Sequence, residues 1–149
     1  MANIYFLVLL ALLAGAAAPF QGTVNNRMAE VLSDPILASF ISFAVGALTL
    51  LIYILVSGTP LSGFAAGRNA PAIAWTGGVL GVFFVVATLV LIPRLGVAMT
   101  FALVTAGQMI FTLVIDHYGL LGVPVREISL MRIAGIVLIT AGVVLIRKF

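Results

Sequence analysis

The sequence predicts an all-α integral membrane protein in which one domain, residues 1–149, forms a bundle of five transmembrane helices. Of its 149 residues, 64% are hydrophobic and only 7% are charged, whereas about a quarter of the residues in a soluble domain are charged. The mean hydropathy is +1.35, so most side chains must face lipid rather than water. A spanning helix uses roughly 20 apolar residues, and the length therefore allows about five spans without a soluble domain.

The composition also excludes several functional classes. The net charge of +3 comes from only 7 basic residues, which form no run suited to a phosphate backbone, so we expect no nucleic-acid partner. The chain has 0 cysteines and 1 histidine, and it contains no nucleophile, phosphate-loop or dinucleotide motif. We therefore predict no enzyme activity, no metal site and no cofactor.

The apolar segments predict helices that are joined by short connections. The first segment ends in small residues, as a signal peptide does, but no Lys or Arg precedes it, so we expect it to be retained. It can continue as an amphipathic helix to Leu32, and Pro19 should kink it. The five helices are expected at about residues 3–25, 35–56, 71–92, 96–118 and 128–146.

Helix boundaries are indicated by capping and turn residues. Asp34 can cap the second helix with Pro35 in its first turn, and the segment 57–63 is rich in turn formers. The segment 93–96, Pro-Arg-Leu-Gly, is expected to form a tight turn. Connections this short predict antiparallel neighbouring helices.

The basic residues are nearly balanced between the two sides of the membrane that five spans would define. The side of the N-terminus would hold three of them and the other side four, namely Arg68, Arg126 and Arg132 against Arg27, Arg94, Arg147 and Lys148. Orientation normally follows a clear excess of basic residues on one side. The balance predicts insertion in both orientations and an antiparallel homodimer of ten helices, the inverted-repeat geometry of many transporters. Insertion in one orientation, decided by a local charge, remains the alternative.

Two polar stripes lie at membrane depth. In the first helix, Gln21 and Asn25 share a face, and Pro19 leaves a backbone carbonyl without its helical donor. In the fourth, the polar positions span about 80° of the helix surface, and they are Thr105, Gln108, Thr112 and Asp116. These groups either line a substrate cavity or hydrogen-bond neighbouring helices. On the first interpretation, Gln21, Asn25, Gln108, Thr105 and Thr112 bind a small polar, near-neutral substrate.

Asp116 and His117 close the fourth helix, next to Tyr118. They can carry a coupling proton, because histidine titrates near neutral pH. Their position near the membrane interface equally fits an ordinary structural role. Small residues also recur at helix-packing spacing, as Gly135 and Gly142 do, which indicates packing within the subunit or a dimer contact.

The sequence resembles the five-helix inner-membrane exporters of the YdcZ type, a family of unknown function in the drug/metabolite transporter superfamily. The resemblance covers essentially the whole chain. Three stretches carry it: residues 18–27 (Ala-Pro-Phe-Gln and Asn-Asn-Arg), 41–46 (Ile-Ser-Phe-Ala-Val-Gly) and 107–119 (Gly-Gln to Asp-His-Tyr-Gly).

The resemblance implies a bacterial inner-membrane location and a half-transporter, because larger relatives contain two inverted five-helix halves. Small multidrug exporters of the superfamily use a membrane-embedded Glu in their first helix. Here the first helix has Gln21 and Asn25, and Glu30 lies beyond the expected span. This departure favours a polar metabolite over a drug cation. The alternatives are a non-transporting scaffold, an accessory subunit of a heteromeric complex and, with weaker support, a passive channel.

Overall fold

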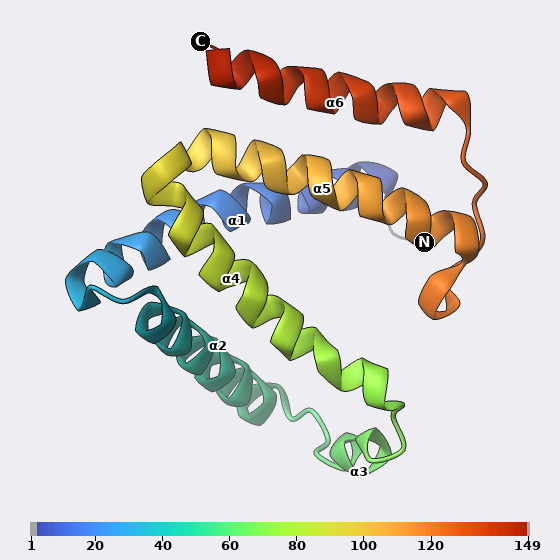
Figure 1. Cartoon of the computed structure of the whole chain (residues 1–149). Coiled ribbons are helices and arrows are strands. Elements are labelled where there is room, and N and C mark those ends of the chain that lie inside the picture. Colours follow the sequence, from blue (N-terminus) through green and yellow to red (C-terminus); the bar gives the residue numbers. More distant parts are fainter. Residues whose placement is uncertain (1–2, 149) are drawn as a thin grey trace. The chain divides into compact units, whose positions relative to one another are not determined.

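The computed structural model describes residues 3–148, with side chains through Ile146, and these residues form helices and connections without any strand. The helices are α1 (Ile4–Leu32), α2 (Pro35–Ser57), α3 (Gly63–Gly67), η1 (Ala72–Trp75), α4 (Thr76–Leu95), α5 (Val97–Tyr118), η2 (Leu120–Gly122) and α6 (Leu130–Lys148). They divide into two units, the first ending at Arg94 and the second beginning at Leu95 (Figure 1).

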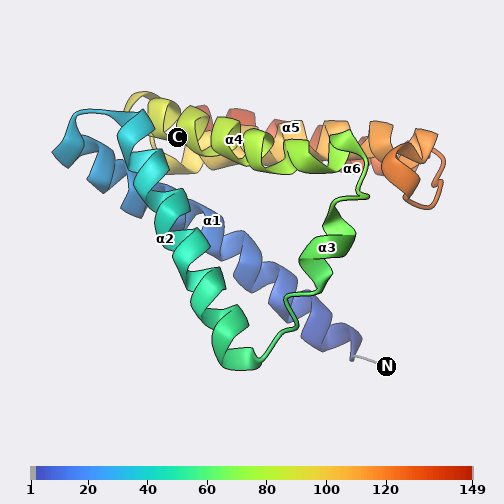
Figure 2. The ribbon, with the colours of Figure 1, turned by 90° about the horizontal axis from the view of Figure 1, so that it is seen from below.

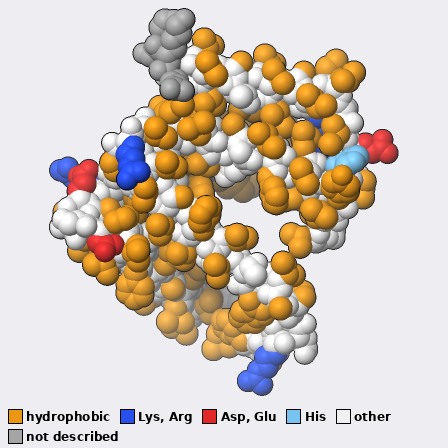
Figure 3. All heavy atoms as spheres, viewed as in Figure 1, with side chains coloured by type: hydrophobic (Ala, Val, Ile, Leu, Met, Phe, Trp, Pro, Cys, Tyr) orange, Lys and Arg blue, Asp and Glu red, His pale blue; other side chains and the backbone are white. Residues whose placement is uncertain are grey.

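Four helical segments within the described residues are long and apolar enough to cross a membrane, namely α1, α2, the segment Ala72–Leu95 and α5. The apolar part of α6, Leu130–Ile146, is shorter. The all-α membrane fold is therefore confirmed, whereas the fifth span and the antiparallel pairing stay predictions. Large apolar side chains are exposed along every one of these helices, and hydrophobic side chains are spread over the face shown in Figure 3. Such a surface is stable against lipid.

In the first unit, the chain reverses between α1 and α2 through a capped turn. Ser33 adopts a left-handed conformation with φ of 53°, and its N–H donates to the last carbonyls of α1. Asp34 then caps α2, because its Oδ1 accepts from the backbone N of Ile36 at 2.6 Å and of Leu37 at 3.0 Å. The two helices pack near this turn and diverge away from it (Figures 1 and 2).

The helix α1 runs without a break through Pro19 to Leu32, as the expected amphipathic continuation requires. Its 29 residues extend about 43 Å at the usual rise, which exceeds the roughly 30 Å hydrocarbon core. An upright α1 is therefore longer than the core, and its two charged residues, Arg27 and Glu30, lie in its last two turns. The kink expected at Pro19 stays a prediction.

The tight turn expected over residues 93–96 is wrong in its extent. Pro93 and Arg94 belong to α4, which continues to Leu95, and only Gly96 separates α4 from α5. A proline near a helix end costs one backbone hydrogen bond without stopping the helix. The break between the two helices falls instead at Gly96, whose φ of 80° favours glycine.

A small core joins α1, α2 and α4 in the first unit. Ala38 of α2 and Val85 and Leu89 of α4 are buried, and Ala29 and Leu32 of α1 pack against them. This contact holds the α1–α2 turn against α4. In the second unit, α6 packs along α5. The side chains of Arg147 and Lys148, which entered the charge balance, lie outside the described part.

Candidate functional site

A groove in the first unit follows the divergence of α1 and α2. Near the turn it has a volume of about 210 Å³ and is lined by Val24, Asn25, Met28, Ala38, Ile41, Ser42 and Val45. Farther from the turn it widens to about 480 Å³, where its lining is Gln21, Ser42, Phe43, Gly46, Ala47, Thr49 and Leu50. Ser42 belongs to both parts, which we together call the α1–α2 groove.

Asn25 is the buried polar group of this groove. Its side chain is only 8% exposed, and its Nδ2 has no hydrogen-bond partner within the described residues. An unpaired buried amide costs about 1–3 kcal/mol. Nδ2 therefore makes no hydrogen bond to a neighbouring helix within the described residues, although it is enclosed by protein.

Gln21 lies one turn before Asn25 and lines the wide part of the groove, where its side chain is exposed. The expected shared face of Gln21 and Asn25 is thus the face turned toward α2. Thr49 contributes an acceptor oxygen, because its hydroxyl hydrogen is donated to the Val45 carbonyl at 2.8 Å. The groove therefore offers amide donors and hydroxyl acceptors on otherwise apolar walls.

Sequence reasoning left Ser42 and Thr49 out of the candidate site. The signal that could have included them is the register of the α1–α2 turn, since the reversal at residues 33–34 brings position 25 of α1 opposite position 42 of α2. The groove lining agrees with this register. In the sequence, Ser42 and Thr49 look like any other polar residue of a helix. Only the register of α2 against α1 identifies them as groove residues.

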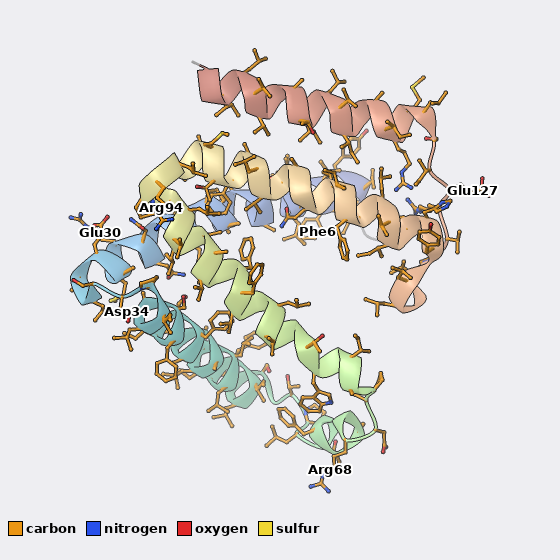
Figure 4. All side chains as sticks on the ribbon, viewed as in Figure 1. Phe6, Glu30, Asp34, Arg68, Arg94 and Glu127 are labelled. Atoms are coloured by element: carbon orange, nitrogen blue, oxygen red, sulfur yellow. The ribbon has the colours of Figure 1, made fainter. Side chains whose placement is uncertain are left out.

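The charges of α1 lie beyond the groove, near the turn. Glu30 accepts a hydrogen bond from Asn26 Nδ2 at 2.9 Å and forms an ion pair with Arg27 Nη1 at 3.4 Å. Both interactions lie along the exposed end of α1. Figure 4 shows Glu30 and Asp34 at this end of the first unit. Glu30 is therefore held away from the groove by its own helix, as expected for a residue beyond the span.

The remaining candidate residues lie in the second unit, on α5. Gln108 and Thr105 are exposed. The Thr112 hydroxyl donates to the Gln108 carbonyl at 2.7 Å, so its hydrogen is used within the helix. The candidate residues thus fall in two units: Gln21 and Asn25 come together in the first, and Thr105, Gln108 and Thr112 belong to the second.

Asp116 has a partner that sequence reasoning missed. Its Oδ2 accepts from Nη2 of Arg132, on the first turn of α6, and the two side chains are 22% and 32% exposed. Nη1 of Arg132 also donates to the Arg126 carbonyl at 3.2 Å, while the Arg126 backbone N donates to the Asp116 carbonyl at 2.8 Å. This arrangement fastens the connection between α5 and α6 and gives Asp116 a structural role.

His117, the next residue after Asp116, is half-buried. Its Nδ1 is buried and has no hydrogen-bond partner within the described residues, and its ring meets that of Tyr118 edge-on at 4.8 Å between centroids. Nothing in these contacts links His117 to the Arg132 pair. A coupling role for Asp116 or His117 stays a prediction.

A second groove follows the contact between α5 and α6. It has a volume of about 220 Å³ and is lined by Met109, Thr112, Leu113, Arg132, Gly135, Ile136 and Ile139. Only Arg132 in this lining is charged. Within residues 3–148 no group of three or more His, Cys, Asp or Glu residues could hold a metal ion.

Comparison with known proteins places these features in a family. The family model described as "Putative inner membrane exporter, YdcZ" matches residues 6–145. The inner membrane protein YdcZ of Escherichia coli (strain K12) is 30% identical over 138 residues, which cover 91% of this chain and 90% of that protein. No solved structure shows significant similarity.

These matches agree with the apolar helices, and together they establish a multi-pass protein of the bacterial inner membrane. They support a transport role in general terms, since the family is described as an exporter and not as an enzyme. Because the family model matches nearly the full length, the chain belongs to the YdcZ family of inner-membrane exporters.

Proposed function

We propose that the protein is a secondary transporter, a half-transporter that works as a dual-topology antiparallel homodimer and moves a small polar metabolite across the inner membrane. The observation that carries the proposal is the unpaired Nδ2 of Asn25, buried against α2 at the narrow part of the α1–α2 groove. A buried donor without a partner is costly. A substrate oxygen that binds there would recover this cost.

The chemistry of the groove favours a substrate without net charge. The side chains lining its two parts are amides, hydroxyls and apolar groups. Glu30, the nearest acid of α1 in sequence to Asn25, is already bound by Asn26 and Arg27. A drug cation would find no carboxylate among the described lining residues, whereas a hydroxylated or amide-bearing molecule could use both donors and acceptors.

In this proposal Gln21 and Asn25 bind the substrate from α1, and Gln108 contributes from α5, with Thr105 and Thr112 beside it. Pro19 shapes the opening, because it has no backbone N–H and leaves a carbonyl one turn earlier in α1 without its helical donor. Two oppositely inserted copies would provide the paired halves that alternating access requires. A non-transporting scaffold or an accessory subunit of a heteromeric complex is the alternative.

The direct test is metabolite efflux from proteoliposomes. Vesicles containing the purified protein are loaded with an isotope-labelled bacterial metabolite extract, and the released compounds are identified by mass spectrometry under pH gradients of both signs. We expect wild type to release one class of uncharged polar metabolite. Asn25→Leu should abolish this release but fold at least as stably, because it removes an unpaired buried amide.

Thr23→Val is the matched control, since Thr23 lies on the same helix and its hydroxyl donates to the Pro19 carbonyl at 2.9 Å. It should leave the release unchanged. If wild-type vesicles release nothing beyond protein-free vesicles, the transporter proposal fails and the scaffold is favoured. If Asn25→Leu and Gln21→Ala transport as wild type does, the transporter survives but the α1–α2 groove is not its site.

A further inference from the structure

The groove between α5 and α6 has a charged end, and apart from Thr112 the rest of its lining is apolar. Arg132 lies at one end, and Ile139 lies seven residues further along α6, about 10 Å away by helical rise. Gly135 and Ile136 line the stretch between them. An amphiphile can place its polar head at Arg132 and its hydrocarbon chain along the apolar lining. A uniformly polar molecule cannot match both parts of the groove.

The guanidinium of Arg132 retains donors for such a head. An arginine side chain has five N–H donors. The Asp116 carboxylate and the Arg126 carbonyl each receive a hydrogen bond from it, and 32% of the side chain is exposed. Planar N–H groups bind phosphate oxygens with favourable geometry. The exposed part of Arg132 can therefore bind a phosphate without giving up Asp116.

The charges around this end are balanced. Arg126 and Arg132 are matched by Asp116 and Glu127, the latter in the connection before α6 (Figure 4). Asp116 uses Oδ2 for Arg132 and is 22% exposed. A purely anionic head gains little net attraction from such a set, but a zwitterionic head can pair its phosphate with Arg132 and its ammonium with Asp116.

We propose that the α5–α6 groove binds one phospholipid with a zwitterionic, amine-bearing head. The phosphate contacts Arg132, the ammonium contacts Asp116, and part of an acyl chain lies along Gly135 toward Ile139. Basic residues between transmembrane helices commonly bind lipid heads. This groove shares no lining residue with the α1–α2 groove, although Thr112 of the proposed substrate site lies in its lining. The lipid proposal does not depend on which substrate the protein transports.

The test fills the groove and counts bound lipid. No atom other than those of its own helix backbone and chain neighbours lies within 4 Å of where a Cβ would stand at Gly135 or at Gly142. Gly135→Leu should therefore occupy the groove without clashing inside the subunit. Delipidated protein in detergent is supplemented with phosphatidylethanolamine, and retained lipid is measured by native mass spectrometry. We expect wild type to retain one lipid per chain and Gly135→Leu to lose it.

Gly142→Leu is the matched control, because Gly142 lies two turns along α6 outside the groove lining, and it should retain the lipid. Glycerophosphoethanolamine, the same head without acyl chains, should not be retained, and phosphatidylglycerol should be retained less well. Retention by Gly135→Leu equal to wild type would overturn the proposal. Loss in Gly142→Leu, binding of the free head alone, or preference for phosphatidylglycerol would each also contradict it.

Discussion

Arg132 connects three segments of the second unit through a single side chain. It pairs with Asp116 at the end of α5 and donates to the Arg126 carbonyl in the connection. It lies in the first turn of α6, where its backbone N donates to Ser129 Oγ at 3.3 Å. A charge held partly away from water is stabilised by such partners. The pair therefore fixes how the connection leaves α5 and how α6 begins.

Asp116→Asn tests this role. We expect it to lower the free energy of unfolding by about 1–2 kcal/mol, because Arg132 keeps its charge but loses its ionised partner. Thermal unfolding in detergent measures the change. The double variant Asp116→Asn with Arg132→Gln should cost less than the two single changes added together.

Glu127→Gln is the control for this prediction, since it removes an exposed acid from the same connection. Its effect should stay within about 0.5 kcal/mol. Strict additivity of the Asp116 and Arg132 variants would show that the two side chains do not interact in the folded protein.

At the level of helices and connections, the end of α5 depends on a glycine. Gly119 has φ of 59°, and a Cβ there would lie 2.7 Å from Val125 Cγ2 and 3.2 Å from the Val123 carbonyl oxygen. Both the backbone conformation and the space exclude a side chain. The connection folds back on the helix end at this residue, which brings Arg126 within reach of Asp116.

Gly119→Ala should therefore destabilise the protein by about 1–3 kcal/mol. Gly107→Ala is the matched control, because Gly107 lies inside α5 and no such atoms lie within 4 Å of its Cβ position. Alanine there should be neutral or stabilising by up to about 1 kcal/mol. The midpoints of thermal unfolding in detergent compare the two variants, and equal midpoints would contradict the account of the α5 end.

The helices were predictable because long apolar segments and their caps are local signals. Asp34 caps α2 as its sequence position indicates, and α1 continues to Leu32. The Asp116–Arg132 pair was not predictable in the same way. Sixteen residues separate its members, and their contact depends on left-handed conformations at Gly119 and Leu121. Leucine rarely adopts such a conformation, so the path of this connection leaves little trace in the sequence.

The candidate site was predictable only within one helix. Helical periodicity is enough to give Gln21 and Asn25 a common face, but the identity of the opposing helix requires the register of the turn. Ser42 lines the groove because this register places it opposite Asn25. Gln108 lies in the other unit, so periodicity within α5 carries no information about its distance from Gln21.

For the whole molecule, the central claim is that one chain supplies both halves of a transporter by inserting in two orientations. The near balance of basic residues on the two sides motivates this claim. Five spans and two inverted copies would reproduce the ten-helix inverted-repeat arrangement of transporters. An exporter family containing chains of this length is consistent with such pairing.

Sidedness in intact cells tests this claim most directly, and the absence of native cysteine makes labelling simple. Thr59→Cys and Val31→Cys leave the charge balance unchanged. Both positions are exposed; Val31 lies in the last turn of α1, just before α2 begins, and Thr59 lies just after α2 ends. A membrane-impermeant maleimide should label roughly half of each variant if both orientations are populated. Complete labelling of one variant and none of the other would contradict dual insertion and the self-paired transporter built on it.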